Sequence, residues 1–218
     1  SKLAETNLLL GTETVVTFLI ASCLIGIVPG PDNLFVLMQS ILHGRKAGVW
    51  VTLGLCTGLL VHTTAVVVGV AAIVQASAIA FSVLKIAGAG YLVYLAWKAF
   101  TSAPQALGNS DEGNSMNAAK LYRRGIIMNI TNPKVSIFFL AFLPQFVDPS
   151  KGPPAMQTFS LGGLFMLMTL VVFGGVAAMA GQLGRLLKRS PRAQVTMNRL
   201  AGIVFLGLAV KIATSGMR

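Results

Sequence analysis

The sequence predicts an all-α integral membrane protein with six transmembrane helices, arranged as two inverted-topology three-helix repeats. Of its 218 residues, 55% are hydrophobic and only 11% are charged, too few polar residues to cover a globular surface. The apolar residues form six continuous runs close to the ~20 residues that cross a bilayer as a helix, without the alternation typical of a membrane β-barrel. A proline-broken segment that carries a charge interrupts the first and the fourth run.

The expected spans follow one another with short connections, except at the middle of the chain. The apolar runs cover residues 15–37, 49–74, 78–100, 125–147, 158–183 and 200–214. The sixth run is short, so its helix would be tilted, matched by a thinner bilayer, or extended backward through Met197. We therefore divide the chain into a first repeat, 1–100, a flexible linker, 101–124, rich in Ser, Asn, Ala and Gly, and a second repeat, 125–218.

The basic residues predict how the chain is oriented in the membrane. A net charge of +11 would suggest nucleic-acid binding in a soluble protein, but most cations lie in or beside the loops after spans one, three and five. They are Arg45, Lys46, Lys98, Lys120, Arg123, Arg124, Arg185, Lys188, Arg189, Arg192 and Arg199. The opposite side holds Lys2, Lys151, Lys211 and Arg218. Because cytoplasmic loops are enriched in Lys and Arg, we expect these three loops inside and both termini outside, with lipid and not nucleic acid as the surroundings.

Two pairs of matching segments indicate an internal repeat. The third span opens at 85–92 with K-I-A-G followed by Y-L, and the sixth opens at 199–206 with R-L-A-G followed by F-L, at the same spacing. Likewise 30–32 (G-P-D) in the first span corresponds to 132–134 (N-P-K) in the fourth. Because each half would hold three spans, the second half must enter the membrane from the opposite side, as in inverted-repeat transporters.

The two interrupted spans are the most informative local feature. Proline lacks an amide donor and glycine is permissive, so Pro29, Gly30 and Pro31 should break the first helix, and Pro133 should break the fourth. The freed backbone groups need partners within the hydrocarbon region. A structural kink packed against neighbouring helices is the alternative, but Asp32, the acid within a span, lies directly beside the first break and favours a functional site.

Three residues at the breaks have the chemistry to bind a zwitterion or carry a proton. An ionised Asp32 accepts hydrogen bonds from an ammonium group, and a buried carboxylate can also take up a proton. Asn33 offers both a donor and an acceptor. Lys134 could meet a carboxylate or neutralise Asp32. A structural salt bridge between Asp32 and Lys134 therefore remains an alternative, and a pair that opens and closes could itself be the switch.

Other polar residues within the spans, and a pair of glycines, are candidates for structural or functional roles. Asn129 and Asn132 are available to satisfy backbone groups exposed beside Pro133. His62, in the middle of the second span, could relay protons near neutral pH, or could simply hydrogen-bond between helices. Gly54 and Gly58 form a GxxxG motif that permits close helix packing, within one protomer or between protomers of a homo-oligomer.

The chain carries no enzyme signature and no sign of a cofactor. It has no metal-ligand cluster, phosphate-binding loop or nucleophile with a nearby base. Two other functional classes are alternatives to an amino-acid transporter. A cation channel or divalent-ion exporter would need several intramembrane acids, whereas Asp32 is the one available. A thiol-redox conduit would need paired cysteines, whereas Cys23 and Cys56 lie in the first two spans and the fourth span has none.

Four segments in this order resemble the LysE/RhtB family of amino-acid exporters. They are 29–33 (P-G-P-D-N), 88–92 (G-A-G-Y-L), 129–134 (N-I-T-N-P-K) and 138–146 (F-F-L-A-F-L-P-Q-F), and the match covers essentially the whole chain in length and span order. The resemblance implies a bacterial inner-membrane protein, and in such a membrane the orientation expected from the basic loops puts both termini in the periplasm. It also implies secondary active export of a small amino acid or close derivative, driven by the proton motive force.

Joined to the residues at the breaks, the resemblance gives a mechanistic hypothesis. The substrate amine binds Asp32, and its carboxylate binds Lys134 or the exposed amides at a broken-helix N-terminus. Asn33 and Asn132 complete the expected contacts. Rocking of one repeat against the other would expose the site alternately to the two sides, and proton uptake on Asp32 from outside, with release inside, would couple export to proton entry.

Overall fold

The computed structural model describes residues 10–28, 30–76, 78–103, 117–182 and 190–214. Several residues named above lie outside these ranges: Pro29 of the first break, the middle of the linker 101–124, and the cations Lys2, Arg185, Lys188, Arg189 and Arg218. The described ranges form helices and connecting turns without a strand, which confirms the all-α prediction.

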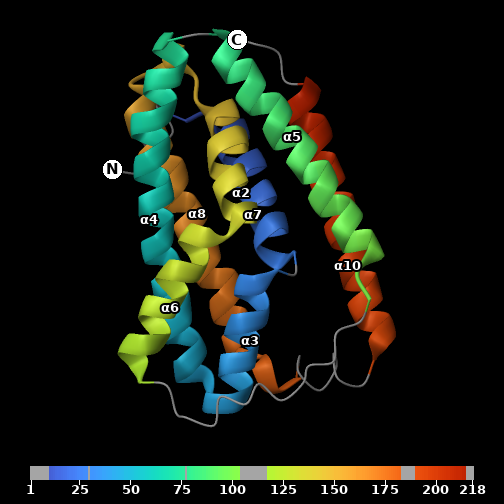
Figure 1. Ribbon diagram of the computed structural model, residues 1–218. Coiled ribbons are helices and arrows are strands. Elements are labelled where there is room, and N and C mark those ends of the chain that lie inside the picture. Colours follow the sequence, from blue (N-terminus) through green and yellow to red (C-terminus); the bar gives the residue numbers. More distant parts are fainter. Residues whose placement is uncertain (1–9, 29, 77, 104–116, 183–189, 215–218) are drawn as a thin grey trace.

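The helices pack side by side as an elongated bundle (Figure 1). In chain order they are α2 (Thr12–Ile27), α3 (Pro31–His43), α4 (Arg45–Ala76), α5 (Ala78–Thr101), α6 (Ala118–Thr131), α7 (Pro133–Ile137), the π-helix η1 (Phe138–Phe142), the 3-10 turns η2 (Leu143–Phe146) and η3 (Pro149–Lys151), α8 (Pro154–Ala178) and α10 (Pro191–Thr214). The α6 helix begins at Ala118, ahead of the expected start at residue 125, because Asn117 caps it with a hydrogen bond from the Ala119 amide.

Three of these helices are long and apolar enough to cross a membrane alone: Arg45–Gly69, Pro154–Ala178 and Arg192–Thr214. The bent pairs Thr12–Ile27 with Pro31–His43, and Ala118–Thr131 with Pro133–Phe146, would each add one span, giving up to five in the described part of the chain. The last span is longer than its apolar run, because its helix already begins at Pro191. Proline is favourable at the first position of a helix, where the backbone N–H would have no partner within the helix.

Both predicted breaks are present and lie near the middle of the bundle (Figure 1). The α2 and α3 helices meet at 60°, and α6 meets the segment that follows it at 51°. Pro31 and Pro133 each occupy the first position of the helix after the break, where proline fits best. Gly30 joins the first pair in an extended conformation, and a Cβ there would lie 3.1 Å from Lys134 Nζ.

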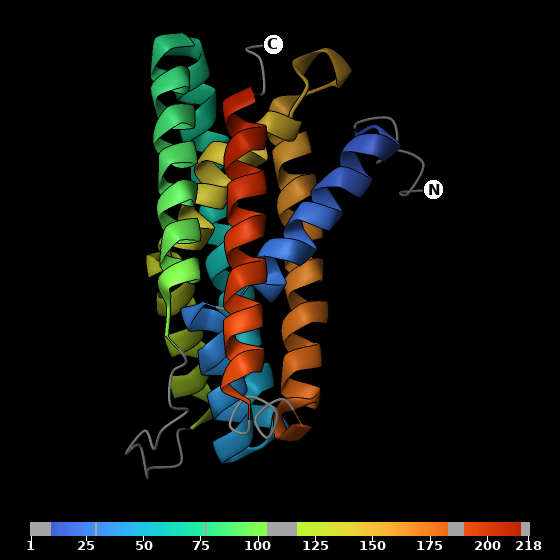
Figure 2. The same ribbon diagram turned by 90° about the vertical axis from the view of Figure 1, so that its right-hand side faces the viewer.

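Cations gather at one end of the bundle, which we call the basic end. Its described members are Arg45, Lys46, Lys98, Lys120, Arg123, Arg124, Arg192 and Arg199. Lys151 and Lys211 lie toward the opposite end, where α2 begins and α10 finishes (Figure 2). Successive long segments alternate in direction between the two ends, and α5 and α10 lie antiparallel to each other along their length (Figures 1 and 2).

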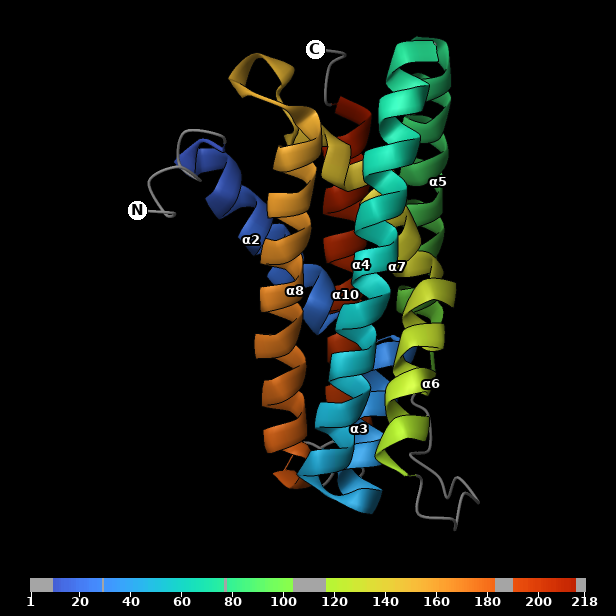
Figure 3. The same ribbon diagram turned by 90° about the vertical axis from the view of Figure 1, so that its left-hand side faces the viewer.

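The α4 helix packs between α6 and α8 (Figure 3). Glycines allow this close approach: a Cβ on Gly54 would collide with the Tyr122 carbonyl and with Gly125. A Cβ on Gly58 would lie 2.7 Å from the Asn129 side chain. The GxxxG motif therefore brings α4 against α6 within one protomer.

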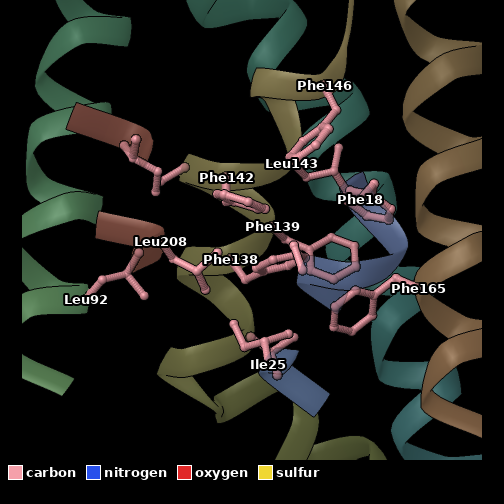
Figure 4. Packing of buried hydrophobic residues seen from close by; sticks show 14 of the residues in the cluster. Phe18, Ile25, Leu92, Phe138, Phe139, Phe142, Leu143, Phe146, Phe165 and Leu208 are labelled. Carbon is pink, nitrogen blue, oxygen red and sulfur yellow. The ribbon is translucent and has the colours of Figure 1, made fainter. Parts of the chain in front are cut away.

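Two apolar layers fill the bundle on either side of the breaks. The aromatic layer, toward the end opposite the basic end, contains Phe18, Phe138, Phe139, Phe142, Phe146 and Phe165 (Figure 4). Its ring centroids are 4.9 to 6.1 Å apart, as in Phe138–Phe165 and Phe138–Phe139, and each such pair contributes about 0.5–1.5 kcal/mol beyond burial. The basic-side layer contains Val36, Ala47, Val51, Leu55, Leu121, Phe173 and Ala177.

Candidate functional site

The side chain of Lys134 joins the two breaks. It is 7% exposed, and its ammonium donates hydrogen bonds to the carbonyls of Ile25 (3.2 Å) and Val28 (3.1 Å). Carbonyls at a helix C-terminus have no partner within the helix, and a cation there is favoured by the helix dipole. Asn33 Nδ2 donates to a third such carbonyl, that of Gly26, at 2.7 Å. The end of α2 is thus satisfied by side chains from both breaks.

Asp32 is the buried acid of the site, at 2% exposure. Its Oδ1 atom has no hydrogen-bond partner among the residues that the structure describes. The polar groups that act on the carboxylate are those of Lys134, Asn132, Asn129 and His62. The Asp32–Lys134 salt bridge that the sequence left open is not formed among the described residues, because the Lys134 ammonium hydrogen-bonds the α2 carbonyls instead.

Three more polar atoms at the breaks are buried without a partner in the described part of the chain: Asn33 Oδ1, Asn129 Oδ1 and Asn132 Nδ2. The Asn132 Oδ1 atom does have one, since it accepts a hydrogen bond from the Lys134 amide at 3.0 Å and caps α7. Unsatisfied buried polar atoms are uncommon in native proteins. Their concentration at the two breaks, together with Asp32, therefore makes the breaks a candidate site for a polar ligand.

His62 connects α4 to the second break. Its Nε2 lies 3.1 Å from the Asn129 carbonyl oxygen, and because a carbonyl only accepts, Nε2 carries the hydrogen. The imidazole also packs on Phe139, with centroids 5.7 Å apart. The interhelical hydrogen bond considered from the sequence is therefore present, and His62 stands within electrostatic reach of Asp32.

A small cavity of about 20 Å³ lies at the junction of the breaks, with room for about one water. It is lined by Ile25, Gly26, Asp32, Asn129, Lys134, Val135, Phe138, Phe165, Thr169 and Phe173. Phe165 belongs to the aromatic layer and Phe173 to the basic-side layer. Side chains of both apolar layers therefore contribute to the cavity lining.

The structure thus brings together residues that the sequence selected separately. Asp32, Asn33, Asn129, Asn132, Lys134 and His62 all lie at the breaks or contact them. The α8 residues of the cavity were missed, because helical periodicity is hidden where nearly every position is apolar. The one signal that could have revealed them is Thr169, a polar residue within the apolar fifth run.

Comparison with known proteins finds one matching family and relatives that align over most of the chain. The family model of the LysE type translocator matches residues 24–216. An uncharacterized membrane protein of Vibrio cholerae serotype O1 is 32% identical over 91% of this chain and 95% of its own length. A homoserine/homoserine lactone efflux protein of Salmonella typhimurium is 31% identical over 91% and 95%. A leucine efflux protein of Enterobacter sp. (strain 638) is 29% identical over 91% and 94%. No solved structure matches the chain significantly.

Proposed function

The chain belongs to the LysE type translocator family, and from this premise we propose that it exports a small amino acid, or a close derivative of one, across the bacterial inner membrane. Relatives that align over nine tenths of the chain carry names of efflux proteins for homoserine, homoserine lactone and leucine. These compounds share an amine on the carbon next to a carboxyl group or its ester. In homoserine and leucine the two groups form a zwitterion, and we take a small zwitterion as the proposed substrate.

The observation that carries the proposal is the set of unpartnered polar atoms at the breaks. Three acceptors, Asp32 Oδ1, Asn33 Oδ1 and Asn129 Oδ1, suit the three N–H donors of a substrate ammonium. On the other side, the Lys134 ammonium uses two of its three donors on α2 carbonyls, which leaves one N–H for a carboxylate. The unpartnered Asn132 Nδ2 offers a second donor. A zwitterion would thus meet opposite charges at its two ends.

We further propose that transport proceeds by alternating access between two inverted repeats. The α5 helix has 24 residues, as many as α10, so counting it as a span gives six in total. In support, the breaks interrupt the bent pairs Thr12–Ile27 with Pro31–His43 and Ala118–Thr131 with Pro133–Phe146, and these two pairs run toward opposite ends of the bundle (Figure 1). The cavity is too small for an amino acid, so the substrate would enter by movement of one repeat that loosens either the aromatic layer or the basic-side layer.

The proposed driving force is proton entry, with Asp32 as the proton carrier. Asp32 would bind either a proton or the substrate amine, since both compete for the same carboxylate. We propose that the basic end faces the cytoplasm, following the positive-inside rule, so that the start of α2 and the end of α10 face the periplasm. Export then corresponds to release of the substrate through the aromatic layer.

Efflux from proteoliposomes tests the proposal. Vesicles are preloaded with a panel of labelled amino acids, and release is followed with and without an imposed inward proton gradient. We expect one chemical class to leave, faster under the gradient, and release to be lost in Asp32→Asn. If no amino acid moves under any condition, the proposed function is wrong. Equal release with and without the gradient would refute proton coupling but leave export standing.

A further inference from the structure

One wall of the cavity is left unused when the substrate amine and carboxylate are bound. This wall is made by Phe165, Thr169 and Phe173 of α8, whose four-residue spacing places their side chains on one face of the helix. All three are buried. Phe165 packs against Phe138, with 4.9 Å between the ring centroids. Thr169 therefore lies between an aromatic ring from each of the two apolar layers.

The polar groups of the cavity fix the direction of a bound substrate. Asp32, Asn129 and Lys134 come from α3, α6 and α7. If they hold the amine and the carboxylate, as in the proposed function on which this inference rests, the side chain extends toward the remaining lining. That lining is apolar except for Thr169.

The hydroxyl of Thr169 has a defined capacity for further hydrogen bonds. Its Oγ1 donates to the Phe165 carbonyl at 2.9 Å, so its proton is engaged while its oxygen lone pairs can still accept. We propose that the α8 face receives the side chain of the substrate, and that Thr169 selects a side-chain hydroxyl over an aliphatic group of the same size. A substrate hydroxyl would donate to Thr169 Oγ1, whereas a methyl group would leave the lone pairs of this oxygen without a donor.

The same face selects against a charged side chain. Among the described residues that line the cavity, Asp32 is the only acid, and the substrate amine already requires it. A second ammonium group would be buried beside Phe165 and Phe173 without a counter-charge, which is strongly unfavourable. The predicted substrates are therefore amino acids with a short neutral side chain, preferably hydroxylated.

Thr52 provides a matched control for Thr169. It is also buried, at 2% exposure compared with 6% for Thr169, and its hydroxyl makes the same type of bond, to the Gly48 carbonyl at 2.8 Å. Such bonds to the preceding turn are common for threonine in helices and need no function. Thr52 lies on α4 and does not line the cavity, so its substitution tests the loss of a buried hydroxyl alone.

Three amino acids that differ in one terminal group provide the probe. Homoserine, norvaline and 2,4-diaminobutyrate each have two side-chain methylenes, which end in a hydroxyl, a methyl and an ammonium group. Their competitive efflux from proteoliposomes is measured for the wild type, Thr169→Val, Thr169→Ser and Thr52→Val. We expect the wild type to prefer homoserine and to discriminate against 2,4-diaminobutyrate. Thr169→Val should lower the homoserine-to-norvaline ratio about three- to tenfold, the range of one neutral hydrogen bond.

The other variants and outcomes separate the possible failures. Thr169→Ser and Thr52→Val should retain the wild-type ratio, and Thr169→Ala replaces Thr169→Val if the valine variant does not fold. An unchanged ratio in the valine or alanine variant, or an equal loss in Thr169→Ser, would overturn the role of Thr169 while export stands. Fast export of 2,4-diaminobutyrate, or export of other amino acids but none of these three, would overturn the neutral side-chain site. Failure of the wild type to export any amino acid would instead overturn the proposed function itself.

Discussion

Replacing Asp32 with asparagine separates binding from folding at the first break. Asp32 Oδ1 is buried and has no partner among the described residues, and an unsatisfied buried atom of this kind costs roughly 1–3 kcal/mol of stability. Asparagine also removes a buried charge, although it gives up the interaction of a carboxylate with the N-terminus of α3, about 0.3–1 kcal/mol. We therefore expect the free energy of unfolding of Asp32→Asn to be unchanged or to rise by up to about 2 kcal/mol.

Amino-acid efflux by Asp32→Asn should fall, although the stability of this variant is unchanged or higher. Removing one member of a buried, hydrogen-bonded charge pair costs about 2–5 kcal/mol, and 1.4 kcal/mol corresponds to a factor of ten. If the substrate ammonium pairs with Asp32, amino-acid efflux by Asp32→Asn should therefore fall by at least about 30-fold.

Asn33→Ala is the comparison for stability. It deletes the 2.7 Å hydrogen bond to the Gly26 carbonyl and should lower the free energy of unfolding by about 1 kcal/mol. Thermal unfolding of the purified proteins in detergent and efflux from proteoliposomes measure the two effects. The reasoning fails if Asp32→Asn transports at the wild-type rate, or if it is destabilised as much as Asn33→Ala, since Asp32 would then serve the fold.

Three further predictions concern packing, pH and topology. Gly58→Leu should force α4 away from α6 and destabilise the protein by about 1–3 kcal/mol. Gly163→Ala is the control, because a Cβ at Gly163 meets nothing within 4 Å. Equal melting temperatures of the two variants in thermal unfolding would contradict this prediction. The hydroxyl and amide of Ser150 hold the pKa of Asp148 below its ordinary value of 3.8. The η3 turn that Asp148 caps should therefore be fully stabilised by this carboxylate above pH 3.8, and should lose the stabilisation as pH falls through the lowered pKa. Hydrogen exchange of the turn should show this loss in the wild type and not in Asp148→Asn. An impermeant maleimide on intact cells should label Ser150→Cys and not Ala119→Cys, and the reverse pattern would invert the topology.

The breaks could be predicted from the sequence because their signals are local. Pro31 and Pro133 can hardly continue a helix from the preceding turn, and an ionisable group such as Asp32 within an apolar run has few alternatives to a functional or paired site. Both breaks and the meeting of their polar residues were therefore expected. Whether these residues bind a substrate is still a prediction.

The partners within the site were not predictable to the same degree. The sequence suggested an Asp32–Lys134 pair because opposite charges attract, but it does not reveal where the carbonyls at the end of α2 lie. In the structure those carbonyls, of Ile25 and Val28, receive the Lys134 ammonium. The α8 face was hidden for a different reason, since its neighbours in the fifth run are as apolar as Phe165 and Phe173 themselves.

Binding of the exported amino acid to the purified protein tests the central claim most directly. A ligand at 100 times its Kd stabilises the folded state by about 2.7 kcal/mol, which thermal unfolding detects without any transport. We predict this stabilisation in the wild type and in Thr52→Val, and its loss in Asp32→Asn, which keeps the fold but lacks the carboxylate for the amine. If the amino acid stabilises Asp32→Asn as strongly as the wild type, the substrate does not bind at the paired helix breaks.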